Sequence, residues 1–474
     1  MTLTLRELLG LSAAGILLAL SMLSVYYSYR TRSPYAGEAS HLFNALGRGQ
    51  SLASNTGAVF SVTYFFGATF IYGAVFRSWV AVVGLLIFLI AGPLMFAITR
   101  RLHAANLLTS PDAGNPLLAL LKQGIARPED FQDIVRLYSL IYFGLLVEEL
   151  AVSRLVLYTL LGNAGVVALF LILLTFVVSR YLHLGGFRAV LAADTVQMTV
   201  LVIFMIALLI VTVSGSVHPG RLLSDFAPQT LLNGFNLAGA VLFGTAWFLA
   251  AIDFYARLRF ETHNKTAATY RGFVVASLVS ICVVLMVGAF FGAFLSAQLT
   301  LRSPSSYALE AVAFFMSQHA IVSCIFVAAV FAMIFTTIDT LLLIVLQVGF
   351  HQEPPRFRRS TLSTIVLIAI ILSTQMDFDS VSAIGIFIGS LLLLPALALC
   401  RAVWPAAFRW LPEQPRYLLW ATFLAIAGFA FVYHLILVRF DRLFLLSFLT
   451  GTSALICALI TVSAGLVRRA NVRD

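Results

Sequence analysis

The sequence predicts an all-helical protein that crosses a lipid bilayer many times, and three observations predict this class. Of its 474 residues, 61% are hydrophobic and only 11% are charged, with a mean hydropathy of +0.99, whereas a soluble domain carries about 25% charged residues. The apolar residues form runs of roughly 20, the length that spans a hydrocarbon core as a helix. These runs are continuous rather than alternating, which excludes strands for most of the chain.

Thirteen membrane spans are expected along the chain. The three longest, which begin near residues 51, 134 and 318, exceed one bilayer thickness and must tilt, break or protrude. No polar stretch is long enough for a soluble domain, and the longest, near 100–133, is expected to be a loop with a short interfacial helix. The expected spans are 8–28, 51–76, 79–99, 134–161, 163–182, 188–214, 232–256, 271–298, 318–349, 359–376, 378–400, 415–438 and 441–467.

The net charge of +10 follows from topology and requires no nucleic-acid partner. If the N-terminus lies outside and thirteen spans alternate, 23 of the 30 Lys and Arg residues fall in cytoplasmic segments and span ends, six fall outside, and Arg154 alone lies well inside a span. This bias follows the positive-inside rule, and the excess charge would contact anionic membrane lipid. We therefore expect a protein of the cell inner (plasma) membrane with its N-terminus outside and its C-terminus cytoplasmic.

An enzyme or an ATP-driven pump is not expected. The sequence has no Walker loop, no G-x-S-x-G elbow, no H-E-x-x-H and no paired C-x-x-C motif. No cytoplasmic loop could house a nucleotide-binding domain, so energy for transport would come from an ion gradient. The four cysteines lack metal-ligand spacing and are expected to be buried apolar residues: Cys282, Cys324, Cys400 and Cys457.

Two long spans are punctuated by glycine and hydroxyl residues. One run extends from Thr56 to Gly73 and the other from Asn233 to Trp247. Paired interruptions at corresponding places in two halves point to a binding site at the bilayer midplane of an inverted-repeat transporter. The alternative is close helix packing through small residues, and composition alone leaves the two interpretations even.

Ionisable side chains within a span are costly, so each is a candidate for function. Glu148 and Glu149 are adjacent and point about 100° apart on a helix, and neither stands three or four residues from Arg154. At least one of these acids is therefore expected to meet another helix, a cation or a proton, and a structural interhelical ion pair is the alternative. The other acids within spans are Asp194, Asp253 and Asp339.

The segment at the start of the sixth span is recognisable. Residues 181–197 read YLHLGGFRAVLAADTVQ. They resemble the signature of the sodium:solute symporter family, in which an aromatic residue, a Gly-Gly pair and Ala-Val precede Thr-Asp and a Gln three residues later. Residues 334–340, IFTTIDT, are similar to the family's Ser/Thr-Ser/Thr-x-Asp-Ser stretch, and residues 253–257, DFYAR, are similar to its Trp-Gln-Arg ending. With the thirteen spans, the resemblance covers nearly the whole chain.

The resemblance implies a LeuT-type fold within a single membrane transport domain, 1–474. Residues 1–50 would form a peripheral first helix and loop, and residues 51–214 the first five-helix repeat. Residues 232–401 would form the inverted second repeat, and residues 415–474 two peripheral C-terminal helices. The partners implied are a small-molecule solute and membrane lipid.

The resemblance also implies a sodium site between the second and ninth spans, with sodium as the coupling ion and no organic cofactor. Thr336 and Thr337 would offer hydroxyl oxygens, Ser61 and Tyr64 would mark nearby backbone carbonyls, and Asp194 would stand on the inner exit path. Sodium is a hard cation that favours oxygen donors, and a broken helix frees carbonyls to supply them. The alternative for the two threonines is back-bonding to the preceding helical turn.

The implied function is sodium-coupled import of a small organic solute by alternating access, with the solute at mid-membrane between the second, fourth, seventh and eleventh spans. An acid there would suit a cationic solute or a coupling proton. Proton coupling stays open, as does a transporter-like solute receptor or regulatory membrane subunit, with or without a separate partner chain. The sequence departs from the family at Ala193, where Thr is usual. The candidate solute-contacting residues are Thr63, Phe65, Phe66, Glu149, Arg154 and Trp247.

Overall fold

The fold is given by a computed structural model of the chain. It describes residues 73–76, 80–108, 115–125, 127–214, 231–258, 274–275, 312–349, 359–412, 415–438 and 442–471, together with scattered positions between 12 and 26. The spans predicted at 8–28, 51–76 and 271–298 therefore lie wholly or mostly outside the described residues. Within the described ranges, all regular structure is helical.

Most described helices overlap predicted apolar runs, and α7 lies in the segment 100–133, where a short interfacial helix was expected. Within the described residues, six helical stretches are long and apolar enough to cross a bilayer, and two of them, Asn233–Ala256 and Asp379–Val403, each include two consecutive helices. The other four are Val82–Ala104, Ala320–Leu346, Arg416–His434 and Leu445–Ala464. The helix bounds are α5 Gly73–Phe76, α6 Val80–Ala104, α7 Pro116–Gly124, α8 Pro128–Leu161, α9 Ala164–Ser214, α11 Leu231–Ala250, α12 Ile252–Leu258, α15 Ala320–Gly349, α16 Arg359–Ser373, α17 Phe378–Ser390, α18 Leu393–Val403, α19 Arg416–Val438 and α20 Leu445–Asn471.

Helix α9 joins two predicted spans, 163–182 and 188–214, without a loop between them. Its Phe170 ring lies 4.8 Å from that of Phe331, and its Phe204 ring lies 5.9 Å from that of Phe326. Phe326 and Phe331 are one and a half turns apart on α15, whereas 34 residues of straight helix would cover about 51 Å. Helix α9 therefore cannot be straight and must bend sharply between Phe170 and Phe204, and whether it crosses the bilayer as two spans stays a prediction.

The run from Asn233 to Trp247 is one of the two for which the sequence left a helix interruption and close helix packing open. Helix α11 is continuous through that run and ends at Ala250, and α12 begins at Ile252. A Cβ added to Gly239 would collide with the carbonyl oxygen of Phe444, at the start of α20. The glycine thus allows close helix contact, which is the alternative that composition left open.

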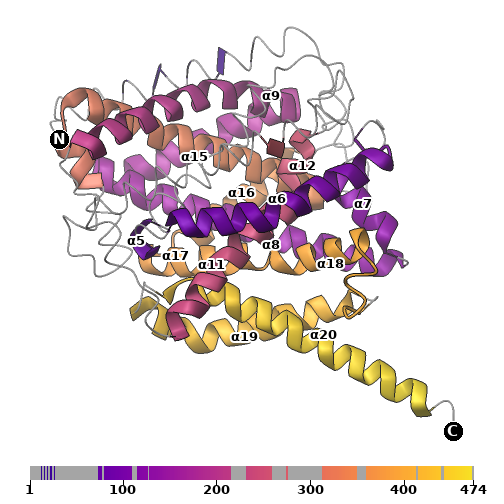
Figure 1. Cartoon of the computed structure of the whole chain (residues 1–474). Helices are drawn as coiled ribbons and strands as arrows, with labels where there is room; N and C mark the ends of the chain where they lie inside the picture. The colour runs from indigo at the N-terminus through magenta and orange to yellow at the C-terminus, as the bar shows by residue number, and fades with distance from the viewer. Residues whose placement is uncertain are drawn as a thin grey trace.

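The helices form a bundle with a buried centre and an apolar edge. The apolar span of α15 is 78% buried inside the protein, and that of α19 is only 28% buried. Helix α15 packs against α9 and α8, whereas α19 and α20 pack together at the edge of the bundle farthest from α9 (Figure 1). Phe431 of α19 is 90% exposed, as expected for a helix face that contacts lipid.

Candidate functional site

Helix α8 carries three ionisable residues in the middle of the bundle. It begins with Pro128, whose missing N–H suits the first helical position. It ends before Gly162, which takes the left-handed conformation (φ 63°) and donates its N–H to the carbonyl of Tyr158. Between these ends, α8 packs against α9, α15, α16 and α17. Its central residues are thus surrounded by protein.

The carboxylates of Glu148 and Glu149 point toward different neighbours. Glu148 lies against α17, where a Cβ added to Gly385 would be 2.7 Å from its Oε1 atom. Glu149 points about 100° away from Glu148 and shares a face of α8 with Ser153, one turn further along. Both glutamates are partly buried. The absence of a side chain on Gly385 provides the space that Glu148 occupies.

Arg154 lies toward the C-terminal end of α8 and is held there by a backbone carbonyl. Its Nη2 atom donates a 2.5 Å hydrogen bond to the oxygen of Met376, in the connection between α16 and α17. The next residue, Asp377, caps α17 by accepting from the backbone N–H and the hydroxyl of Ser380. These hydrogen bonds hold the pKa of Asp377 below its usual value. Arg154 is thus fixed on a well-ordered turn rather than paired with either glutamate.

A buried polar cluster joins α9 to α15. The hydroxyl of Thr336 donates to Oε1 of Gln197 across the helix interface, and the hydroxyl of Thr337 donates to the carbonyl of Met333, 3.1 Å away. Asp194 is only 2% exposed and precedes Gln197 by three residues, so the two share a face of α9. Back-bonding therefore occurs at Thr337, and Thr336 makes an interhelical contact instead.

Six residues predicted for the sodium and solute sites remain, and the structure describes one of them. Trp247 of α11 is 8% exposed and packs on α17, where a Cβ added to Gly389 would lie 3.2 Å from its ring. The other five, Ser61, Thr63, Tyr64, Phe65 and Phe66, lie outside the described residues. The second-span half of the predicted sodium and solute sites therefore stays a prediction.

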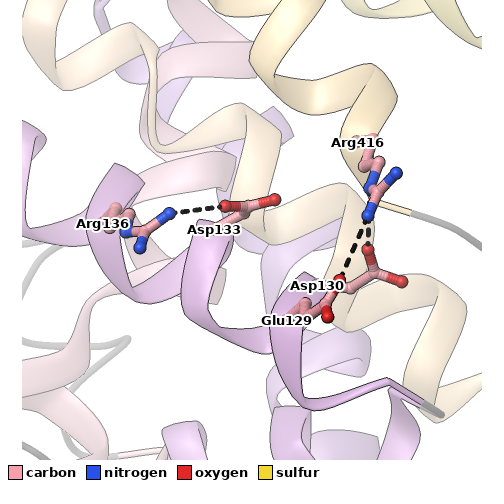
Figure 2. Close-up of polar contacts among 5 residues, drawn as sticks. All are labelled: Glu129, Asp130, Asp133, Arg136 and Arg416. Atoms are coloured by element: carbon pink, nitrogen blue, oxygen red, sulfur yellow. Dashed lines mark hydrogen bonds and ion pairs between the residues drawn. The ribbon is translucent and has the colours of Figure 1, made fainter.

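An ion-pair network ties α19 to the start of α8. Figure 2 shows Arg416 between two acids, with Nη2 3.3 Å from Oε2 of Glu129 and Nε 3.4 Å from Oδ1 of Asp130. The Asp130 side chain is 3% exposed, whereas that of Glu129 is 79% exposed. Solvent therefore screens the Arg416–Asp130 ion pair less than the Arg416–Glu129 ion pair.

Sequence reasoning missed the partners in these contacts. Gln197 belongs to the recognised signature but received no role, although its spacing from Asp194 already placed both on one helix face. Asn115 followed by Pro116 is a helix-start signal, and Asn115 indeed caps α7. Nothing in the sequence indicated that Tyr142 would meet α12.

No family model matches the sequence, and no curated protein matches it. Two similar solved structures are membrane transporters. One, described as the substrate-bound outward-open state of a Na+-coupled sialic acid symporter, matches 96% of this chain and 98% of its own at 15% identity, with a TM-score of 0.52. The other is Mhp1, a nucleobase-cation-symport-1 family transporter in a closed conformation with bromovinylhydantoin bound. It matches 86% of this chain and 90% of its own at 13% identity, with a TM-score of 0.44.

The chain has the fold of a membrane transporter. The likeness to the sialic acid symporter extends over nearly the full length of both proteins, and at this identity it shows the fold alone. Together with the six long apolar helices, it indicates an all-helical, multi-pass membrane protein. The count of thirteen spans and the two inverted repeats stay predictions.

Proposed function

We propose that this chain is a secondary transporter of the sodium:solute symporter type that imports a small organic solute with sodium by alternating access. The observation that carries the proposal is the buried polar cluster of Asp194, Gln197, Thr336 and Thr337 between α9 and α15. Such groups are costly inside a membrane protein and are found mainly where an ion, a proton or a solute passes. The transporter fold supports this interpretation.

The chemistry of the cluster suits sodium. Each threonine hydroxyl donates its proton to a neighbour, Thr336 to Gln197 and Thr337 to Met333. The lone pairs of the hydroxyl oxygens then remain as acceptors, and a hard cation binds such oxygen donors. Backbone carbonyls near Ser61 and Tyr64 would complete the shell, and the Asp194 carboxylate would lie on the exit path to the cytoplasm.

The solute would bind beside α8 and α11. Glu149 and Arg154 of α8 and Trp247 of α11 supply an acid, a cation and an aromatic surface, and Thr63, Phe65 and Phe66 would face them from the second span. The Arg154 bond to Met376 fixes the guanidinium at the end of α8 predicted to lie outside. This arrangement favours a small polar organic solute that has a cationic group to pair with Glu149.

Uptake by purified protein in proteoliposomes tests the proposal. Amino acids, carboxylates, sugars and polyamines would be offered with an inward sodium gradient, with an equal potassium gradient, and with an inward proton gradient. We expect accumulation of at least one solute only when sodium is higher outside. Solute binding without accumulation under any gradient would contradict the proposal and indicate the solute-receptor alternative.

Proton coupling is the second candidate, and the placement of Glu149 favours it. Glu149 lies in the middle of α8, partly buried among the helices of the bundle, where a carboxylate is a candidate for carrying a proton across the membrane. Accumulation driven by the proton gradient alone would support this alternative over sodium coupling.

A further inference from the structure

The connection between α11 and α12 is a single non-helical residue in a buried place. Helix α11 ends at Ala250, Ala251 is the break, and the seven-residue helix α12 begins at Ile252. Both Ala251 and Ile252 are at most 3% exposed. Backbone groups freed by a helix break inside a membrane protein must find new partners.

Two side chains from other helices supply these partners. The N–H of Ile252 donates to the hydroxyl of Tyr142 in α8, at 3.0 Å, and its carbonyl accepts from Nδ2 of Asn115, at 3.1 Å. The Oδ1 atom of Asn115 accepts at the same time from the N–H groups of Leu117 and Leu118, so the residue also caps α7. One residue of the break is therefore tied to α8 and to α7.

The neighbouring phenols differ from Tyr142 in an informative way. Tyr138, one turn before Tyr142, and Tyr255 of α12 are both fully buried, and neither hydroxyl has a hydrogen-bond partner among the described residues. A buried hydroxyl without a partner is unfavourable. Tyr142 and Asn115 thus hold the start of α12 in place. The hydroxyls of Tyr138 and Tyr255 would gain hydrogen bonds in a rearrangement that admits water.

We propose that Asn115 and Tyr142 form a cytoplasmic latch that holds α12 closed and releases Ile252 when solute and ion leave to the inside. The proposal rests on the proposed function, because a latch is needed only in a protein that alternates its access. Both residues are positioning residues, since they act on the backbone of α12. The latch lies at the predicted cytoplasmic end, because α7 belongs to the segment 100–133.

Three substitutions separate the latch from other roles of these residues. Tyr142→Phe removes the hydroxyl, which accepts from Ile252 and also interacts with Asp253 of α12, and it keeps the ring. Tyr138→Phe is the matched control, because it removes a buried hydroxyl one turn away that has no such partner. Asn115→Ser retains an oxygen that can cap α7 but is too short to reach Ile252, so the loss of the cap and the loss of the latch are distinguished.

Labelling of Cys400 measures the opening of the latch. Cys400 of α18 is 5% exposed, and α18 packs against α7, the helix that Asn115 caps. In full-length protein with the other three cysteines replaced by alanine, inside-out vesicles would be treated with a small maleimide and the modification rate recorded. Size-exclusion profiles and thermal unfolding show that each variant is folded.

We expect Tyr142→Phe and Asn115→Ser to raise the labelling rate of Cys400 by about two- to tenfold, the population change for one lost buried hydrogen bond. Tyr138→Phe should leave it unchanged. Equal rates for Tyr142→Phe and Tyr138→Phe in folded protein would overturn the latch. The labelling needs neither sodium nor solute, so a failed uptake screen would remove the proposed function while this difference could still stand. Intact sodium-driven uptake with equal labelling would remove the latch alone.

Discussion

Side chains that the sequence singled out acquire partners that it could not specify. Thr336 and Thr337 stand next to each other on α15, yet one bonds Gln197 of α9 and the other the carbonyl of its own helix. A helix places adjacent residues about 100° apart, so two like side chains necessarily meet different surroundings. Residue type and spacing predicted that the two threonines lie in a buried part of the helix. Only the packing of the helices decides which neighbouring group each hydroxyl meets.

Replacing both Thr336 and Thr337 with alanine should weaken sodium activation of uptake. Two oxygen donors leave the proposed shell, and the interaction of one such donor with a charged partner is worth roughly 1.5–3 kcal/mol. We expect the sodium concentration for half-maximal uptake to rise by about tenfold or more, with little change in protein abundance. The double serine variant, which keeps both hydroxyls, is the control. Unaltered sodium activation in the alanine variant at normal expression would remove these residues from the site.

Glu149→Gln should change the pH profile of uptake or the preference for cationic solutes, because the amide keeps the shape of the side chain and removes its charge. Glu148→Gln is the paired comparison, since Glu148 points about 100° away from Glu149 and lies against Gly385 of α17. Uptake at several pH values, with cationic and neutral solutes in competition, measures both effects. If both variants lower only thermal stability, the acids are structural and the proton and cationic-solute ideas fail together.

Glycines in α11 serve helix contact, and the break in this helix lies at a residue that has no sequence signal for one. Gly239 and Gly244 lie against Phe444 and Ile87, so the backbones approach closely there. At the break after Ala251, the backbone of Ile252 bonds to Tyr142 and Asn115 of other helices. Apolar runs therefore sufficed to predict the helices of the described ranges, but a break that depends on distant side chains could not be predicted from local sequence.

Gly239→Ala should destabilise the protein, whereas Gly234→Ala in the same helix should not. The added methyl at Gly239 meets the carbonyl of Phe444, which is backbone and cannot rotate away, and overpacking of this kind costs about 1–3 kcal/mol. A methyl at Gly234 meets nothing within 4 Å, and alanine favours helix by up to about 1 kcal/mol. Thermal unfolding in detergent should show shifts of opposite sign. Equal melting temperatures for the two variants would refute the close contact between α11 and α20.

Contacts between distant parts of the chain provide a check on the topology of the whole molecule. Arg416 meets Glu129 and Asp130, and Arg154 meets Met376. In the thirteen-span prediction an even number of crossings separates the members of each pair, so each pair lies on one side of the bilayer. This even count requires that 163–182 and 188–214 cross the bilayer separately. The parity therefore stays a prediction that sidedness measurements can test.

Cysteine labelling at two exposed glutamines tests the predicted orientation. Gln123, near the end of α7, lies in the segment predicted to be cytoplasmic, and Gln375, between α16 and α17, lies in the connection predicted to be outside. In a background without native cysteines, we expect an impermeant maleimide applied to intact cells to label Gln375→Cys and not Gln123→Cys. Inside-out vesicles should give the reverse pattern. Both sites are exposed and both replacements are the same, so a difference in reactivity reports sidedness. Labelling of Gln123→Cys from outside intact cells would rule out the outside N-terminus, and labelling of both sites from one side would rule out the thirteen-span count.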